Sequence, residues 1–254
     1  MTRILTARTI IFTLALMAYT CLAPHTGHLQ DRILFNSGPE LVAFIHSLQP
    51  EQEMDQLGSL NIFSSSKKPQ TVPLRYKIVL TPTNWISTYI AWPECTTNFM
   101  VKVIFSREEP PVYIIEYSTN DLKIVTPITN KAELWTRFCN SDFYIADLGL
   151  EFLYWANQRL IKREMRRSRY CYVLESTPPP SAFSPYARVI SWIDTETFGI
   201  VRAEARDTNN KLIKEFEPKE FKKIQGVWYV TELQIRDFLR SSRTRIQFTL
   251  QNTH

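Results

Sequence analysis

The sequence predicts a mainly β domain of the α+β class, in which one antiparallel sheet carries a few helices. Two observations predict this class. From about residue 57 onward, apolar and polar residues mostly alternate with the period of two that is typical of strands covered on one side. Two shorter windows, 37–49 and 141–155, instead repeat their apolar residues with helical spacing. The length of 254 residues suits one such domain.

The N-terminus has the features of a secretion signal. Arg3 and Arg8 supply positive charge, and the uncharged apolar stretch 10–22 is shorter than the roughly 20 residues that a membrane-spanning helix needs. We therefore expect residues 1–24 to be a signal peptide and residues 25–254 to be an exported domain. Lipid attachment at Cys21 and an uncleaved N-terminal anchor are the alternatives.

The net charge and the cysteine content indicate which partners and which disulfide bonds this domain can have. Two arginines and no acidic residue leave with the signal, so the formal charge falls from +5 to +3, which is too mild to indicate a nucleic-acid partner. Cys95, Cys139 and Cys171 then remain, without a Cys-x-x-Cys pair. Either one disulfide forms, with Cys95–Cys139 as the favoured pair, or none does. Cys171 lies in a strand pattern and is expected to be a small core residue.

The two helical windows begin with recognisable signals. Ser37 can cap the first helix and Pro39 fits its first turn. The second helix is expected from about Asp142, after one or two helical turns within 131–138, although Gly149 weakens it by about 1 kcal/mol relative to alanine. The apolar faces of the two helices are Leu41, Phe44, Ile45 and Leu48 in the first, and Tyr144, Leu148, Phe152 and Trp155 in the second.

Alternation and turn residues define the strands. Loops rich in Pro, Asn, Asp and Gly separate them, as antiparallel connections require. The expected windows are 57–64, 74–80, 85–92, 99–106, 111–117, 122–127, 158–167, 170–177, 186–193, 200–207, 211–224, 227–238 and 244–250.

Side chains for catalysis are scarce. Of the four histidines only His46 lies well inside the domain, where a half-buried or surface position on the first helix is expected. No glycine-rich phosphate loop occurs. We therefore expect no catalytic residues, no metal site and no cofactor. An exported hydrolase is the third alternative, but the sequence shows no nucleophile–base pair that such an enzyme would need.

Two groups of residues are candidates for binding. A sheet curled around helices would bring several large apolar side chains to its concave side, where they could line an apolar cavity or its lid, with plain core packing as the alternative. The basic run 159–169 is either a solvated hairpin or a contact for an anionic partner or membrane surface. The cavity candidates are Phe143, Leu148, Phe152, Trp192, Trp228, Tyr229 and Leu233, and the contact candidates are Arg166, Arg167 and Arg169.

The C-terminal half resembles the outer membrane lipoprotein-sorting protein family, the relatives of the periplasmic carrier LolA and the receptor LolB. The resembling pieces occur in a consistent order: SDF at 141–143, DL at 147–148, CYVLE at 171–175, SPYARV at 184–189, WID at 192–194, KL at 211–212 and FKKIQGVW at 221–228. The resemblance implies an incomplete antiparallel β-barrel of about eleven strands, with helices plugging its open side.

The resemblance also implies a role. Carriers of this kind shelter the acyl chains of lipoproteins in an apolar cavity and carry them across the periplasm toward the outer membrane. The implied partners are an acylated lipoprotein or another lipid, and an inner- or outer-membrane protein, with the protein itself a periplasmic monomer that is anchored only if its N-terminus is retained. The alternative is an envelope-stress sensor, or another non-catalytic interaction protein, that uses the same fold.

The export prediction has a direct test. Mass measurement of the protein from an exporting host should place its first residue between about 22 and 29, where the small residues that follow the apolar stretch allow cleavage. A mass that includes acyl chains on Cys21 would instead indicate a tethered protein, and an intact Met1 would contradict cleavage.

Overall fold

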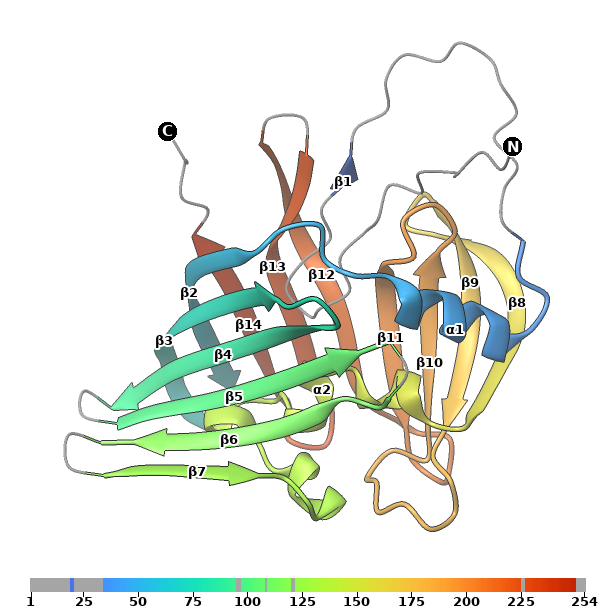
Figure 1. The fold of residues 1–254 in the computed structure, drawn as a ribbon. Coiled ribbons are helices and arrows are strands. Elements are labelled where there is room, and N and C mark those ends of the chain that lie inside the picture. Colours follow the sequence, from blue (N-terminus) through green and yellow to red (C-terminus); the bar gives the residue numbers. More distant parts are fainter. Residues whose placement is uncertain are drawn as a thin grey trace.

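One antiparallel sheet dominates the fold (Figure 1). The computed structural model describes residues 19–20, 34–94, 97–107, 109–119, 122–224 and 227–249. Its strand order is β7-β6-β5-β4-β3-β2-β14-β13-β12-β11-β10-β9-β8, and the two-residue strand β1 (Tyr19–Thr20) pairs with β13 off this path. The strands are β2 (Met54–Ser64), β3 (Lys67–Leu80), β4 (Asn84–Glu94), β5 (Thr97–Ser106), β6 (Val112–Ser118), β7 (Lys123–Pro127), β8 (Asn157–Arg166), β9 (Arg169–Thr177), β10 (Arg188–Asp194), β11 (Ile200–Arg206), β12 (Leu212–Ile224), β13 (Val227–Asp237) and β14 (Ser242–Thr249).

The strand windows read from the sequence are confirmed, and the strand number taken from the family resemblance is not. Thirteen strands follow the main path where about eleven were expected. Each half of the sheet is a meander of consecutive hairpins, and the pairing of β14 with β2 joins the two halves. The sheet is open, because β7 and β8 end the path at opposite edges.

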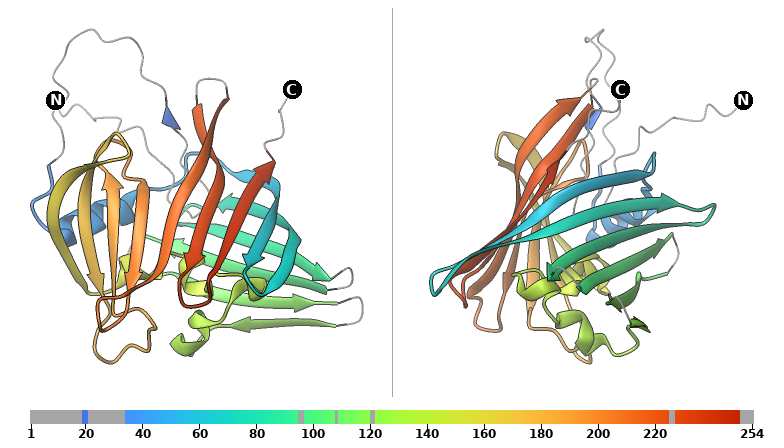
Figure 2. Two further views of the ribbon diagram at one scale, coloured as in Figure 1. Left: turned by 180° about the vertical axis from the view of Figure 1, so that it is seen from behind. Right: turned by 90° about the vertical axis from the view of Figure 1, so that its left-hand side faces the viewer.

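The sheet folds back on itself around the helices. Figure 2 shows the limb β3–β7 and the limb β8–β13 diverging from their junction at β2 and β14, with the helical segments between them. The Tyr89 hydroxyl of β4 donates to the Leu148 carbonyl at 3.3 Å, while the Lys214 ammonium of β12 donates to the Asp142 carbonyl at 2.5 Å. The helical segment therefore contacts both limbs. It consists of the 3₁₀ turns η1 (Lys131–Trp135), η2 (Phe138–Asn140) and η3 (Glu151–Tyr154), with α2 (Ile145–Leu148) among them.

The first helix forms as its sequence predicts. Helix α1 spans Gly38–Ser47, and the Ser37 hydroxyl accepts a hydrogen bond from the Glu40 amide at 3.3 Å. Leu41 and Ile45 are buried against the core. Gly38 is required for this packing, because a Cβ there would overlap the backbone of Gln158 at the start of β8.

The second predicted helix is broken, which corrects the sequence prediction. Helix α2 ends at Leu148, and Leu150 takes a left-handed conformation with φ of 52° before η3 begins. Gly149 lies directly against the Tyr113 ring, where a Cβ would overlap. The break lets the segment turn inside the sheet, so Leu148, Leu150 and Phe152 are all buried.

Neither of the two described cysteines forms a disulfide bond. Cys139 and Cys171 are buried free thiols, so the favoured Cys95–Cys139 disulfide does not form, and Cys95 lies outside the described residues. Burial raises the pKa of Cys139 to about 12 and that of Cys171 to about 11, because an apolar environment disfavours the thiolate.

A buried polar cluster fixes the helical segment to β12–β14. The Asp142 carboxylate accepts from Ser242 Oγ at 2.5 Å and from Thr244 Oγ1 at 2.8 Å, and is 1% exposed. Arg137 lies 3.6 Å from this carboxylate and pairs with Asp237 at 2.6 Å. Removing Asp142, Arg137 or Asp237 leaves a buried charge without its partner.

Lys214 of β12 completes this cluster from the other side. Its Nζ donates to the Asp142 carbonyl at 2.5 Å and lies 3.4 Å from Asp147, which also accepts from the Tyr186 hydroxyl at 2.9 Å. The same Nζ lies 3.2 Å from the Tyr144 ring centroid. Burial lowers the pKa of Lys214, and the charge of Asp147 opposes that shift.

Asp142→Asn is expected to lower the free energy of unfolding by about 3 kcal/mol, because the neutral amide cannot balance the buried cations and presents a donor where the carboxylate accepted two hydroxyls. Asp55→Asn, which removes an exposed partner of Arg75 and Lys77, should cost less than about 1 kcal/mol. Urea titrations of both variants check this pair, and equal losses would contradict the assigned role of the cluster.

A candidate ligand-binding groove beside helix α1

A groove of about 290 Å³ runs along the outer side of α1. Three segments far apart in the sequence form its walls: α1, the β5–β6 turn, and the stretch from η3 to the start of β8. Most of the lining is apolar, with charges only at the β5–β6 rim, and we call it the α1 groove. Its lining residues are Pro39, Val42, Ala43, His46, Arg107, Glu109, Pro110, Leu153, Tyr154, Trp155, Ala156 and Gln158.

Gln158 shapes one wall of the α1 groove. Its Nε2 donates to the carbonyls of Phe152 at 3.0 Å and Trp155 at 2.8 Å, while its Oε1 accepts from Ser176 Oγ at 2.7 Å. These bonds satisfy carbonyls left without partners where η3 ends. They fix the turn that presents Trp155 and Ala156 to the groove.

His46 closes the inner end of the α1 groove. Its ring stacks on Tyr154 with centroids 4.0 Å apart and planes 6° apart. Burial lowers the pKa of His46 from 6.5 to about 4, and a hydrogen bond with the Leu153 backbone opposes this shift. The imidazole is therefore neutral near pH 7. Its Nε2 is buried and has no hydrogen-bond partner among the described residues.

A small enclosed space lies behind His46. It has a volume of about 10 Å³, enough for roughly one water molecule. Trp85 lines it, stacked on Phe105 with centroids 5.0 Å apart, and its Nε1 is a second buried polar atom without a described partner. The α1 groove is therefore apolar along most of its walls, and the unpaired nitrogen of Trp85 lies in the separate space behind it, so the groove suits a ligand with an apolar body.

The predicted cavity residues are distributed over both faces of the sheet. Phe143, Leu148, Phe152 and Leu233 are buried in the main hydrophobic core, and Tyr229 packs against it. These side chains fill the space between the limbs and do not line the α1 groove. The side chain of Trp228 lies outside the described residues.

Trp192, another predicted cavity residue, lies on the outer face of the sheet, away from the helices. It packs with Cys171 and Val173 in a small separate cluster, and its Nε1 donates to Glu164 at 2.6 Å. Its neighbour Ile193 is the residue of β10 that enters the main core. Strand alternation therefore places Trp192 outside.

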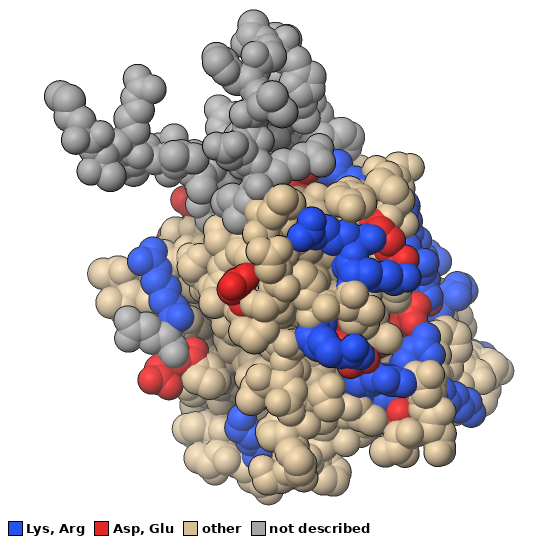
Figure 3. Space-filling model, turned by 90° about the vertical axis from the view of Figure 1, so that its right-hand side faces the viewer, with Lys and Arg blue, Asp and Glu red and all other residues tan. Residues whose placement is uncertain are grey.

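The three predicted contact arginines have partners within the chain. Arg167 lies 2.6 Å from Glu217, Arg169 lies 2.5 Å from Asp194, and the Arg166 guanidinium lies 4.8 Å from the Trp192 ring centroid. Figure 3 shows basic and acidic side chains interspersed on this side of the molecule. Contact of this hairpin with an anionic partner stays a prediction.

Sequence reasoning missed most of the α1 groove. His46 was expected to be half-buried or at the surface, and is partly buried, but its stacking partner Tyr154 was not foreseen. The one available signal was the apolar outer side of α1, where Val42 and Ala43 follow the core position Leu41. The other wall depends on the break at Gly149, which the pattern of the second helix did not reveal.

Within the described residues, no three metal-ligating side chains gather closely enough to hold an ion. No helix in that part of the chain combines the length and apolar character needed to cross a bilayer.

Comparisons with known proteins place this fold. A family model described as "Uncharacterized protein" matches residues 119–252, which is more than half of the chain. The chain belongs to this family. A search of curated protein sequences finds no match.

Solved structures share most of the fold of this chain. A DUF1329 family protein from Desulfovibrio piger is 19% identical with a TM-score of 0.65, covering 84% of this chain and 90% of its own. A domain described as an outer membrane lipoprotein-sorting protein from Vibrio parahaemolyticus is 16% identical with a TM-score of 0.64, over 85% and 93%. A LolA superfamily protein from Nitrosomonas europaea is 14% identical with a TM-score of 0.57, over 84% and 92%. The family member therefore has the LolA-like fold, and the resemblance seen in its sequence is confirmed.

The shifted pKa of His46 predicts how the stability of the domain depends on pH. Between pH 6.5 and about 4 the unfolded chain binds a proton on His46 that the folded chain does not, so stability falls as pH falls through this window. The loss reaches about 2 to 3 kcal/mol. His46→Phe retains an aromatic ring for stacking and removes the titration, so urea titrations should show this variant losing less stability than the wild type between pH 7 and pH 4. Parallel losses would contradict the assignment.

Proposed function

We propose that this protein is a non-catalytic carrier in the periplasm that shelters acyl chains of a lipoprotein or another lipid between its sheet and its helices. The observation that carries the proposal is the apolar α1 groove, which leads toward the core of a LolA-like fold. Transfer of an acyl chain from water into such a space gains about 0.8 kcal/mol for each CH₂ group buried. A carrier of this kind needs no catalytic residue.

The α1 groove provides the first contact for the acyl chain. Its walls on either side, Ala43 and Val42 on α1 and Trp155 and Ala156 after η3, are apolar over their length. The volume of about 290 Å³ lies at the lower end of the range for small-molecule sites. The groove therefore takes part of an acyl chain as it stands, and a longer chain requires the space behind it.

Helix α1 is the element that opens that space. Its inner face, with Leu41 and Ile45, covers the core, and the stacked pair His46 and Tyr154 closes the inner end of the groove. The buried side chains of Phe143, Leu148 and Phe152 already fill the interior. When α1 moves outward, the acyl chain takes its place against the core, so apolar surface that the helix uncovers is covered again by the ligand.

The same proposal places the protein in a sorting pathway. The likeness to a lipoprotein-sorting domain and to a LolA superfamily protein supports movement of acylated lipoproteins toward the outer membrane. The predicted signal peptide at residues 1–24 supports export to the periplasm. We further propose that a membrane protein delivers or receives the cargo, since an acyl chain must leave one bilayer and enter another.

The binding test fills the groove without altering the core. Ala43 and Ala156 are exposed on opposite walls, so Ala43→Trp combined with Ala156→Trp should weaken the binding of a fluorescent fatty acid roughly tenfold or more, because two indole rings occupy the ligand volume. Displacement titrations on the purified domain measure this change. Mass spectrometry of an organic extract of the wild-type protein should also show a bound lipid.

Ser47→Trp is the matched control, since it adds one indole to an exposed position of α1 outside the groove. Its affinity for the probe should match that of the wild type. Equal weakening by the control, or no uptake of acyl probes by the wild type, would refute the proposed function.

A further inference from the structure

A second hollow, of about 390 Å³, lies on the outer face of the sheet at the β13–β14 turn. It is formed by the end of β2, the end of β13 and the start of β14, on the opposite side of the sheet from the main core. We call it the hairpin hollow. Its lining residues are Phe63, Ser64, Ser65, Arg236, Asp237, Phe238, Ser241, Ser242 and Arg243. None of them lines the α1 groove.

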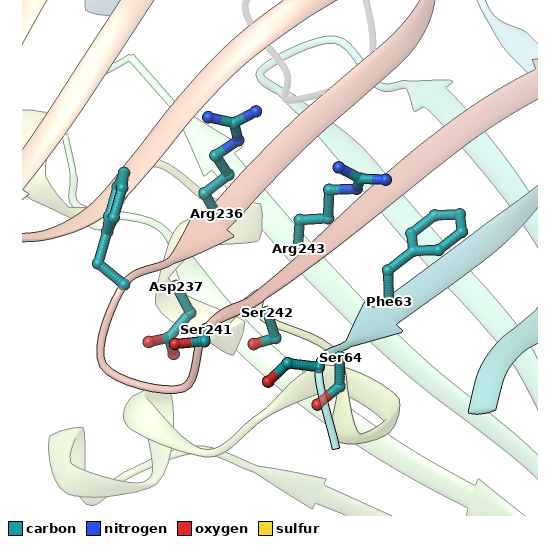
Figure 4. A pocket seen from close by; sticks show the side chains of 9 residues that line it. Phe63, Ser64, Arg236, Asp237, Ser241, Ser242 and Arg243 are labelled. Atoms are coloured by element: carbon teal, nitrogen blue, oxygen red, sulfur yellow. The ribbon is translucent and has the colours of Figure 1, made fainter. Parts of the chain in front are cut away.

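Two arginines lie side by side on adjacent strands at this hollow. Arg236 of β13 and Arg243 of β14 are directly opposite in the strand register, and Figure 4 shows both side chains extending on the same side of the sheet. Like charges in directly opposite positions destabilise a sheet. Neither guanidinium has an ion pair with a described residue, and Arg243 lies over the Phe63 ring at 5.0 Å.

The nearby carboxylates are engaged elsewhere. Asp237 pairs with Arg137 at 2.6 Å and is 3% exposed, so it is turned into the buried cluster. Glu215, the cross-strand neighbour of Arg236 on β12, pairs with Arg202. The hairpin hollow therefore keeps its positive charge. This contrasts with Arg167 and Arg169, whose charges are matched by Glu217 and Asp194.

The rim of the hollow combines more positive charge with exposed apolar side chains. Phe238 is 43% exposed and Leu239 is 63% exposed at the hairpin turn. Lys67 and Lys68 lie exposed just across the β2–β3 turn, whereas Arg240 of the hairpin turn lies 3.9 Å from the buried carboxylate of Asp142. Paired guanidinium groups bind phosphate oxygens, and an exposed Phe–Leu tip inserts among acyl chains at a bilayer surface.

We propose that the hairpin hollow is a docking site for an anionic phospholipid membrane, in which Arg236 and Arg243 bind lipid phosphate and Phe238 and Leu239 enter the interface. The apolar tip beside the arginines favours a membrane over a soluble phosphate compound. The site lies apart from the α1 groove, so docking and acyl-chain uptake are separate activities of the protein.

Cosedimentation with vesicles tests the site. The wild type should bind vesicles of phosphatidylcholine that contain phosphatidylglycerol, and bind pure phosphatidylcholine vesicles weakly. Arg236→Gln combined with Arg243→Gln should reduce the partition coefficient roughly 25-fold, since each basic residue at an anionic surface contributes about a fivefold factor. Leu239→Ser should weaken binding separately, and high salt should weaken the arginine contribution.

Arg75→Gln combined with Lys123→Gln is the matched control, because it removes the same charge from exposed positions on β3 and β7. The control should bind the anionic vesicles nearly as the wild type does. An equal loss in the control would overturn the site in favour of a general charge effect. Calorimetry with inorganic phosphate should show no binding, and phosphate binding at the two arginines without vesicle binding would overturn the membrane assignment.

The same variants separate this proposal from the proposed carrier function. The Arg236→Gln and Arg243→Gln double variant should keep the wild-type affinity for the fatty acid probe. The Ala43→Trp and Ala156→Trp double variant should keep wild-type vesicle binding. Loss of vesicle binding in the filled-groove variant would mean that the membrane is contacted through the α1 groove, which would overturn docking at the hairpin hollow.

Discussion

The position of the helical segment depends on the buried carboxylate of Asp142. The segment between β7 and β8 contains only short turns of helix, and four residues of α2 cannot form a stable helix by themselves. Ser242 and Thr244 on β14 and the Lys214 ammonium on β12 hold its start, and Asp147 repeats the attachment one turn later. Since the core on both limbs packs against this segment, the interior of the fold follows from these few charge-assisted bonds.

The strands could be predicted closely because one feature, alternation, determines both the strand and its covered face. Where the alternation of apolar and polar residues is absent, the covered face of a strand could not be predicted. Residues 171–174 of β9 are buried on both faces of the sheet, so the pattern around Trp192 does not reveal which side is the interior. The β8–β9 turn has no glycine, yet Arg167 and Ser168 both take positive φ, with Arg167 held by the Pro218 carbonyl and Glu217. Those partners are about fifty residues away in sequence.

The α1 groove could not be predicted, because it is built from tertiary contacts. The pairing of His46 with Tyr154 requires the break at Gly149, and that break depends on close contact with the Tyr113 ring of β6. Three of the motifs that carried the family resemblance, SDF, DL and SPYARV, instead contribute residues to the buried cluster. Asp142, Asp147, Tyr186 and their neighbours thus record how this fold is held together, and the side chains that would select a ligand lie elsewhere.

The paired charges on the outer face of β8–β12 have a consequence for the electric field of the whole molecule. Arg159 and Arg188 share the single carboxylate of Glu175, so this group keeps one positive charge, whereas Arg202 and Arg206 are balanced by Glu204 and Glu215. Residues 157–224 together contain 14 Lys and Arg against 9 Asp and Glu, so this wall carries positive charge in addition to that at the β13–β14 turn. An anionic surface therefore attracts two parts of the molecule, and the exposed apolar tip of Phe238 and Leu239 distinguishes the turn from the wall.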